Sequence, residues 1–299
     1  MSAPNRLFQL VRLMRPYQWI KNSFVLVGLV FGHGWDDAEL AGEVFVLFAG
    51  FCLASSGVYV LNDVFDREAD RVHPEKRHRP LAGGGIGVPL ALAWAGLLET
   101  AGLGLAWQVS GNALLLVSVY VVLNIAYSAG LKHVAVLDVF LIASGFMLRI
   151  LAGTLGVGIE PSHWLLGCGL MLTLFLGFAK RRAELASLDG LSDADVAVQR
   201  KSLAAYSLPL LDRLITICAA GAVIGYAFYT LDAETIAIHG TDQLIWTLPI
   251  VLYGVFRYLY ALYRQEGGAD PARDVLRDPH LIGALAGWVA LTFWLITRA

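Results

Sequence analysis

Charge is the first thing that this sequence lacks. Asp, Glu, Lys and Arg make up only 15% of its 299 residues, against about 25% in a typical soluble domain. Hydrophobic residues make up 57%. This composition excludes an ordinary soluble globular protein, and no feature of the sequence indicates nucleic-acid binding.

Cysteine is also scarce. Cys52, Cys168 and Cys218 fall in apolar stretches, and no pair has the spacing of a metal or redox motif. We therefore interpret them as small buried residues. The glycine-rich "AGGGIG" lacks the strand and helix context of a phosphate loop. The start, "MSAPNRLFQLVRLMRPYQW", lacks the apolar core and cleavage site of a secretory signal, and we read it as a basic, amphipathic segment at the membrane interface.

Long apolar runs recur along the whole chain. A helix needs about 20 apolar residues to cross a bilayer. We count nine such runs, of which the first is short and begins before residue 22. They are 22–35, 41–61, 87–107, 110–128, 135–157, 163–179, 208–231, 243–262 and 281–297. The sequence therefore predicts an all-α, polytopic membrane protein with nine transmembrane helices in one domain, residues 1–299.

The basic residues are distributed unevenly between the connections. All Lys and Arg except Arg149 and Arg298 lie before the first run, after the second and fourth, or around the connections that follow the sixth and eighth. The opposite connections, such as "HGWDDAELAGE", contain none. Since cytoplasmic loops carry the excess of Lys and Arg, we expect a cytoplasmic N-terminus and an outer C-terminus in the cell (inner) membrane.

The connection after the second run, "NDVFDREADRVHPEKRHRP", interleaves acids with bases. On a helix, Asn62, Asp66 and Asp70 would share one face, since they are four residues apart. Neighbouring carboxylates repel unless a cation lies between them, and hard oxygen ligands suit Mg²⁺ bound to a diphosphate. The spacing therefore predicts a magnesium site formed by these three residues, at the cytoplasmic face.

Basic residues accompany these carboxylates. Asp63, Arg67 and Arg71 form a parallel stripe that would either pair internally, Asp63 with Arg67, or bind phosphate. His73-Pro74 should end the helix. Further candidate phosphate ligands follow at Lys76, Arg77 and Arg79. The alternative is a solvated, salt-bridged loop, but acids at the end of a membrane span are usually functional.

This stretch resembles the first aspartate-rich motif of the UbiA superfamily of intramembrane prenyltransferases. "YSAGLKHVAVLD", with Tyr127, Lys132 and Asp138, is similar to the superfamily's Tyr-x-x-x-x-Lys region, and "RPYQWIKN" near the N-terminus adds to a likeness that covers nearly the whole chain. The resemblance implies a nine-helix, UbiA-like bundle.

One part departs from the superfamily's pattern. The resemblance implies a second aspartate-rich motif after the sixth helix, where this chain has "KRRAEL". That substitution, and the late "GGADPARDVLRDPHL", resemble the decaprenyl-phosphate phosphoribosyltransferase group. The implied reaction moves phosphoribose from phosphoribosyl diphosphate to a polyprenyl phosphate, toward lipid-linked arabinose donors.

Two alternatives remain open at this stage. An aromatic prenyltransferase that uses a prenyl diphosphate and a 4-hydroxybenzoate-like acceptor shares the fold and the first motif. A transporter or flippase is disfavoured, because most charge lies at one membrane face rather than near the midplane. The oligomeric state is left open, a homo-oligomer included.

The implied reaction assigns roles to individual residues. The acceptor phosphate is already ionised and needs cations rather than a general base. We expect Asp66, Asp70, Lys21 and Lys132 to be catalytic and Lys180, Arg181 and Tyr127 to bind phosphate. Asp138 would orient Lys132 or the ribose hydroxyls. The substrate-binding set is Asp63, Arg67, Arg71, Lys76, Arg77, Arg79, Tyr127, Asp138, Lys180 and Arg181.

Two structural expectations complete the analysis. Arg149 and Glu99 would lie at similar depths, roughly 20 Å from the cytoplasmic ends of their helices. We predict an ion pair between them, because an unpaired charge at that depth is costly. Asp278-Pro279 should be the cap and the first residue of the last helix.

Overall fold

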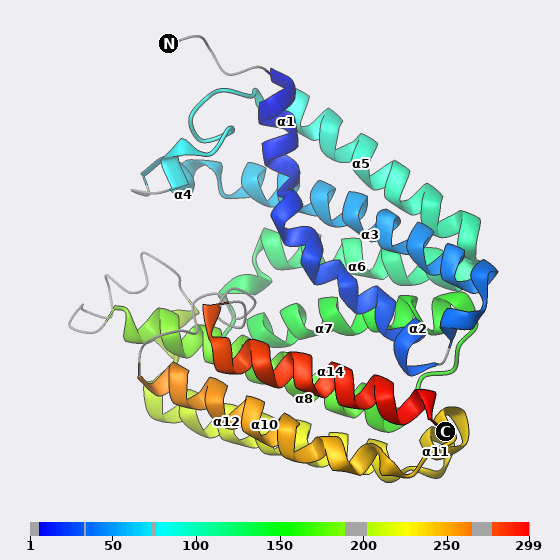
Figure 1. Ribbon diagram of the computed structural model, residues 1–299. Coiled ribbons are helices and arrows are strands. Elements are labelled where there is room, and N and C mark those ends of the chain that lie inside the picture. The colour runs from blue at the N-terminus through cyan, green and yellow to red at the C-terminus, as the bar shows by residue number, and fades with distance from the viewer. Residues whose placement is uncertain (1–5, 33, 73–75, 189–201, 265–276, 299) are drawn as a thin grey trace. The chain divides into compact units, whose positions relative to one another are not determined.

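The structure, a computed structural model, describes residues 6–32, 34–72, 76–188, 202–264 and 277–298. Every regular element in these ranges is a helix, and they contain no strand (Figure 1). The chain divides into two compact units, Met1–Lys132 with Gly145–Pro161, and His133–Ser144 with Ser162–Ala299. Each unit is described by itself. That the chain forms a single domain stays a prediction.

The first unit holds the N-terminal helices and the aspartate-containing connection. Its elements are α1 (Arg6–Met14), η1 (Pro16–Leu26), α2 (Val27–Phe31), η2 (Gly34–Asp36), α3 (Ala38–Phe65), α4 (Arg67–Val72), η3 (Lys76–His78), α5 (Val88–Val109), α6 (Gly111–Ala129), the second half of α7 (Leu137–Ala152) and η5 (Leu155–Val157). The short η4 (Leu131–His133) follows α6. Phe51 and Tyr120, both fully buried, meet edge to face in its core.

The second unit holds the C-terminal helices. Its elements are the first half of α7, α8 (His163–Ala186), η6 (Leu203–Ala205), α10 (Leu208–Leu231), α11 (Ala233–His239), η7 (Gln243–Thr247), α12 (Leu248–Tyr263) and α14 (Pro279–Thr297). Phe175 packs edge to face on Tyr258 in a core that α8, α10 and α12 share.

Eight helical segments of the described residues are long and apolar enough to cross a membrane. They are Ala38–Phe65, Val88–Val109, Gly111–Ala129, Leu137–Val157, His163–Ala186, Leu208–Leu231, Gln243–Tyr263 and Pro279–Thr297. These coincide with the last eight predicted runs, so the prediction of a polytopic helical membrane protein is confirmed. The first run differs, because η1 and the short α2 occupy it in place of one long α-helix.

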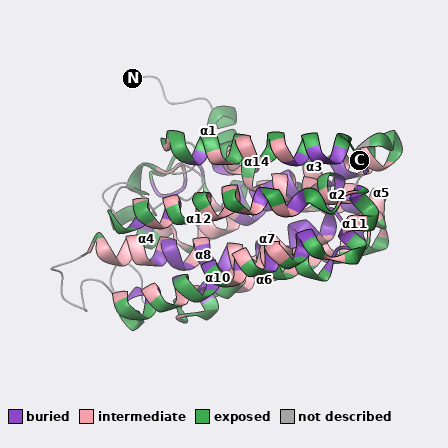
Figure 2. Ribbon diagram, turned by 60° about the horizontal axis from the view of Figure 1, so that its bottom comes forward, coloured by how far each residue is buried: buried purple, intermediate pink, exposed green. Residues whose placement is uncertain are grey.

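Apolar side chains cover much of the outer helix surface. Ile217, Ile224 and Phe228 on α10 are each about half-exposed or more. On α14, Leu285 and Phe293 are more than half-exposed. Figure 2 shows exposed residues along both helices. Such surface is stable in contact with lipid chains, which are as apolar as the side chains themselves.

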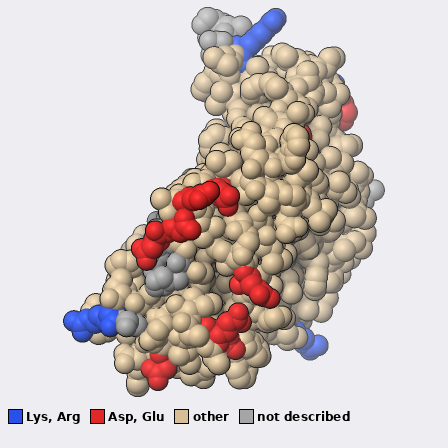
Figure 3. Space-filling view, turned by 90° about the vertical axis from the view of Figure 1, so that its right-hand side faces the viewer, with Lys and Arg blue, Asp and Glu red and all other residues tan. Residues whose placement is uncertain are grey.

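Three connections between the helices carry no positive charge. Residues 32–37, 153–162 and 232–247 contain no Lys or Arg. On the face drawn in Figure 3, acidic side chains are scattered and basic ones are few. This pattern agrees with the charge asymmetry on which the predicted orientation depends.

The last helix begins as the sequence predicts. Asp278 is the N-cap of α14, with Pro279 in its first turn, and the carboxylate accepts hydrogen bonds from the amides of His280 and Leu281. Burial acts to raise the pKa of Asp278, but bonds from Arg257 and these two amides outweigh it, so the pKa lies below its ordinary value.

Glycines permit one close backbone contact in the first unit. A Cβ on Gly153, just after α7, would lie 1.7 Å from the Val25 carbonyl oxygen, and one on Gly28 would lie 1.8 Å from the Gly153 carbonyl oxygen. Small residues at such places let membrane helices approach closely. Segment η1–α2 and the end of α7 therefore need glycine where they meet.

We expect Gly153→Ala to destabilise the protein by about 1–3 kcal/mol, because the added methyl group forces these backbones apart. Gly96→Ala is the matched control, since a Cβ there meets nothing within 4 Å. Thermal unfolding of both variants in detergent measures the difference. Equal melting temperatures would contradict the close contact.

Candidate active site

The aspartate-containing connection continues α3 only in part. Helix α3 ends at Phe65, Asp66 is its C-cap residue, and α4 begins at Arg67. Backbone hydrogen bonds still run from the Asp66 amide to the Asn62 carbonyl and from the Asp70 amide to the Asp66 carbonyl. The predicted four-residue spacing is therefore kept, but the side chains form two separate groups.

The first group surrounds Asp66. Lys132 forms an ion pair with one oxygen of its carboxylate. The Asn62 side-chain amide donates to the other oxygen at 3.2 Å, and Ser128 donates to the Asn62 side-chain oxygen at 3.0 Å. The end of α6 and η4 thus supply a lysine and a hydroxyl to the end of α3. Asp66 remains 30% exposed, so a ligand can reach its carboxylate.

The second group surrounds Asp63 and Asp70. A single nitrogen of Arg79 donates to Asp63 at 3.1 Å and to Asp70 at 2.6 Å, and Arg15 pairs with the same oxygen of Asp63. Both carboxylates are almost fully buried. Two buried acids are therefore held by two guanidinium groups, as their burial requires. The predicted pairing of Asp63 with Arg67 is not found.

Arg15 was not among the predicted site residues. It lies between α1 and η1 with a left-handed backbone, φ +53°. Its guanidinium also lies over the Tyr59 ring, 5.4 Å from the centroid. From the sequence, Arg15 counted only toward membrane topology, because 48 residues separate it from Asp63 and no local pattern links the two.

The predicted metal ligands fit Mg²⁺ in their chemistry. Asn62, Asp66 and Asp70 offer an amide oxygen and two carboxylates, the hard donors that Mg²⁺ prefers. As the side chains stand, no group of three or more His, Cys, Asp or Glu within the described ranges could hold a metal ion. Asp66 contacts Lys132 instead, and Asp70 contacts Arg79. The donors are present, and basic side chains bind two of them.

Several other predicted residues also lie in the first unit. Arg67 and Arg71 both pair with exposed Glu68, at 3.6 and 3.0 Å. Lys76 and Arg77 are exposed in η3, Lys21 is half-buried in η1, and Tyr127 is half-buried in α6. Helix α4 ends at Val72, as the following His73-Pro74 predicts, although residues 73–75 lie outside the described ranges.

Asp138 and Arg181 form a buried ion pair in the second unit. Arg181 of α8 is 1% exposed and donates to Asp138 at 2.8 Å, and its other end pairs with Glu184. Ser202 and Tyr206 also donate to the Asp138 carboxylate, at 3.3 and 2.8 Å. Neighbouring Lys180 is half-buried. Asp138 was predicted to orient Lys132 or the ribose hydroxyls; the ion-pair partner of Lys132 is Asp66, and the role toward ribose stays a prediction.

Tyr206 is a second residue that the sequence did not single out. Its hydroxyl accepts a hydrogen bond from the Val136 amide, and Val136 has a left-handed backbone, φ +69°, which is unusual for a β-branched residue. Burial, together with the neighbouring Asp138, raises the pKa of Tyr206 well above its ordinary value. The hydroxyl therefore stays protonated and donates to Asp138.

The predicted Arg149–Glu99 ion pair is wrong. Arg149 donates to Asn22, Tyr120 and the Gly145 carbonyl instead. Both carboxyl oxygens of Glu99 are buried, and neither has a hydrogen-bond partner among the described residues. The depth estimate ignored direction around the helix, so it could not say which side chains face each other.

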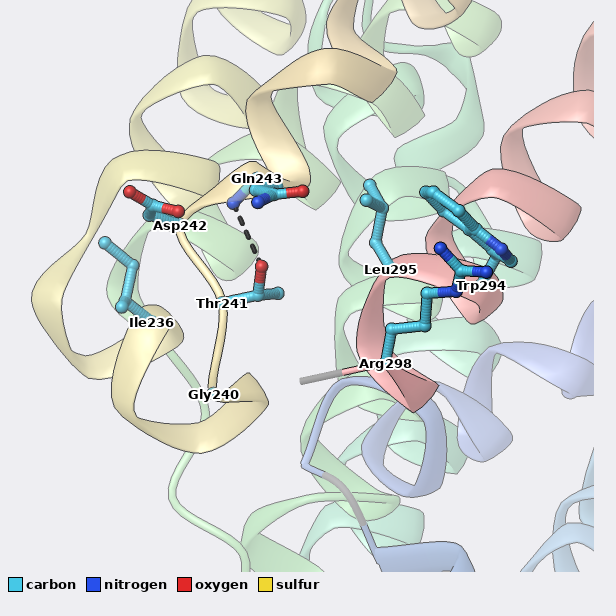
Figure 4. A pocket seen from close by; sticks show the side chains of 8 residues that line it. All are labelled: Ile236, Gly240, Thr241, Asp242, Gln243, Trp294, Leu295 and Arg298. Atoms are coloured by element: carbon cyan, nitrogen blue, oxygen red, sulfur yellow. Dashed lines mark hydrogen bonds between the residues drawn. The ribbon is translucent and has the colours of Figure 1, made fainter.

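A pocket of about 560 Å³ lies in the second unit. The loop after α11 and the end of α14 line it, and Figure 4 shows Asp242 and Arg298 on opposite sides. Arg298 lies over the Trp294 ring, 4.3 Å from its centroid. None of the predicted site residues lines this pocket.

Known proteins resemble this chain over nearly its full length. The family model described as the UbiA prenyltransferase family matches residues 22–276. The decaprenyl-phosphate phosphoribosyltransferase of Mycolicibacterium smegmatis is 36% identical, over 94% of this chain and 90% of that protein. The protein of the same name from Corynebacterium glutamicum is 34% identical, over 94% and 84%. A UbiA homologue from Archaeoglobus fulgidus, solved with GPP and Mg²⁺, superposes with a TM-score of 0.73 at 20% identity, covering 97% of this chain and 99% of that one.

Proposed function

Because this chain belongs to the UbiA prenyltransferase family, we propose that it is a polyprenyl-phosphate phosphoribosyltransferase. It moves 5-phosphoribose from phosphoribosyl diphosphate to a decaprenyl-type polyprenyl phosphate and releases diphosphate. Relatives of that name at 36% and 34% identity support the choice of reaction.

The observation that carries the proposal is the cluster at the end of α3. Three carboxylates, Asp63, Asp66 and Asp70, are each paired with a cation that comes from another segment. Those cations are Arg15, Arg79 and Lys132. Lysine and arginine side chains bind phosphate oxygens as readily as they bind carboxylate oxygens. The cluster can therefore receive an anionic substrate by exchanging existing partners.

Asn62, Asp66 and Asp70 would hold Mg²⁺, as the donor chemistry allows. The UbiA homologue from Archaeoglobus fulgidus that was solved with Mg²⁺ supports metal use in this fold. Bound there, the ion supplies neutralisation of the leaving diphosphate. Asp63, Arg15 and Arg79 keep the carboxylate-bearing helix end in place beside it.

The chemistry is a displacement at the anomeric carbon. An oxygen of the polyprenyl phosphate forms a bond to C1 of the ribose, the bond from C1 to the diphosphate oxygen breaks, and diphosphate leaves with the electron pair. The acceptor is already ionised, so Lys132, Lys21 and Arg79 position phosphates rather than move protons. Attack opposite to the leaving group inverts C1, and isolation of a covalent ribosyl-enzyme would overturn this step.

The basic end of α8 takes the place of the second aspartate-rich motif. Arg181 is occupied by Asp138 and Glu184, and Arg182 pairs with Asp212 at 2.6 Å. We propose Lys180 and Arg181 as phosphate ligands at this end of α8. Arg181 is a phosphate ligand only if its carboxylate partners are exchanged.

We place the reaction at the cytoplasmic face of the cell membrane, with the N-terminus inside and the C-terminus outside. Basic connections alternate along the chain with connections that lack Lys and Arg, which supports this orientation, since positively charged loops stay in the cytoplasm. Phosphoribosyl diphosphate is a soluble, charged donor and would reach the enzyme from that side.

The proposal is tested by supplying both sets of substrates. The purified protein is incubated with Mg²⁺, labelled phosphoribosyl diphosphate and decaprenyl phosphate, and separately with geranyl diphosphate and 4-hydroxybenzoate. We expect label in the lipid extract of the first reaction, lost when the metal is chelated. Prenylated 4-hydroxybenzoate without any phosphoribosyl lipid would establish the aromatic prenyltransferase instead.

A further inference from the structure

Segment η1 is an unusually long 3₁₀-helix. It runs for 11 residues, Pro16–Leu26, whereas such helices rarely exceed three or four residues because their hydrogen-bond geometry is poor. A 3₁₀ stretch of this length needs support from outside the segment. It also carries Lys21, one of the predicted catalytic cations.

Side chains of α3 and α7 hold η1 along its length. Trp19 donates to Ser56 of α3 at 3.0 Å, and Phe24 packs edge to face on Phe146 of α7. In the middle lies Asn22, which is 1% exposed and donates to Ser55 at 3.2 Å. Side chains near both ends of η1 thus contact α3 and α7, and a buried amide lies at its centre.

Arg149 of α7 meets that amide from the other side. It is 4% exposed, and its Nε donates to the Asn22 side-chain oxygen at 2.8 Å. Its remaining nitrogens donate to the Tyr120 hydroxyl at 2.9 Å and to the Gly145 carbonyl at 2.7 Å. The guanidinium carbon also lies 4.6 Å from the centre of the Tyr120 ring.

No described carboxylate pairs with Arg149. A cation at this depth is costly, and here neutral oxygens and aromatic faces offset part of the cost. Methionine or leucine would fill such a position more cheaply if only packing were required. The arginine is therefore used for something that an apolar residue cannot supply. It also lies over the Phe51 ring of α3, but among its hydrogen bonds the one that reaches a segment outside α6 and α7 is the bond to Asn22.

We propose that Arg149 is a positioning residue: through Asn22 it fixes the centre of η1 and thereby the placement of Lys21. The inference rests on the proposed function for the role of Lys21, but the physical hold on η1 does not depend on it. Loss of the hold leaves η1 free to leave the 3₁₀ geometry, and a cation displaced by about 1 Å can cost up to roughly 10²-fold in rate.

Asn22→Ala is the decisive variant. It removes the hydrogen bond between Arg149 and η1 but keeps the Arg149 side chain in the core. We expect amide hydrogen exchange within residues 16–26 to become about tenfold faster, while exchange in α5 stays unchanged. We expect kcat to fall about tenfold with little change in KM for phosphoribosyl diphosphate. Asn22→Asp should restore both, since its carboxylate accepts from the same Nε.

Asn124→Ala is the matched control. Asn124 is half-buried in α6, and its amide donates to the Tyr120 carbonyl within the same helix, so its loss should alter neither exchange in η1 nor kcat. Native exchange across residues 16–26 in Asn22→Ala would overturn the hold, and so would faster exchange that Asn22→Asp fails to reverse. Amide hydrogen exchange is measured without substrate. If the wild-type protein were inactive with both the phosphoribosyl and the prenyl substrates, only the proposed function would be rejected. Faster exchange with native kcat would reject only the role of Lys21.

Discussion

Asp66→Asn is expected to lower kcat/KM by roughly 10²- to 10³-fold, the cost of removing one charge-stabilising group from an active site. The substitution keeps the shape of the side chain, and an oxygen remains that can accept from the Asn62 amide. What it removes is the charge that pairs with Lys132 and the carboxylate that would bind Mg²⁺. The loss should persist at saturating phosphoribosyl diphosphate, because it concerns the leaving diphosphate in the transition state.

Asp232→Asn is the matched control for this experiment. Asp232 caps α11, where it accepts from the Thr235 amide at 3.4 Å, and it belongs to the second unit. Lipid-linked product is measured for both variants over a range of Mg²⁺ concentrations, with melting temperatures to show that both are folded. Native activity in Asp66→Asn, or a loss of equal size in Asp232→Asn, would contradict a catalytic role for Asp66.

Apolar run length could be read directly from the sequence. The eight spans that the structure contains follow the predicted runs closely, because a helix that faces lipid must be apolar over a fixed length. The start of the last helix at Asp278-Pro279 was predicted for a similar reason, since the cap and the proline act within one turn.

Partners from distant segments could not be read in the same way. The spacing of Asn62, Asp66 and Asp70 indicated a shared face, but not that Lys132 and Arg79 would bind the two carboxylates. Arg15, 48 residues from Asp63, gave no local signal at all. A period along the chain defines a face of a helix, whereas the identity of the partner depends on packing that the period does not encode.

The environment of Arg149 shows a related limit. The cost of burying the Arg149 charge predicted an acidic partner for it, and Glu99 was the acid at a matching depth. The structure satisfies the arginine with an amide, a hydroxyl, a carbonyl and ring faces. Several neutral groups can replace one carboxylate, and Asn22 could not be recognised as one because it lies in a 3₁₀ segment whose apolar pattern resembles an α-helix.

Arg181→Met should destabilise the protein by about 3–5 kcal/mol, because it removes a buried ion-pair partner of the Asp138 carboxylate. Asp138 is 0% exposed, and Ser202 and Tyr206, which also donate to it, are neutral. Unfolding in mixed dodecyl maltoside and SDS micelles measures the loss. The neighbouring Arg182→Met is the matched control. Its partner Asp212 is 34% exposed, so water can solvate the orphaned acid, and a cost of about 1 kcal/mol or less is expected.

The double variant Arg181→Met/Asp138→Asn separates a structural pair from a phosphate ligand. If the arginine serves to neutralise Asp138, removing both charges should recover most of the stability, since apolar or neutral replacements of a buried pair are often tolerated. Activity per folded molecule should then recover as well. If Arg181 instead binds substrate phosphate, the double variant would be stable and yet show a raised KM for phosphoribosyl diphosphate. Equal destabilisation by Arg181→Met and Arg182→Met would contradict both readings, because burial of the orphaned carboxylate would then not set the cost.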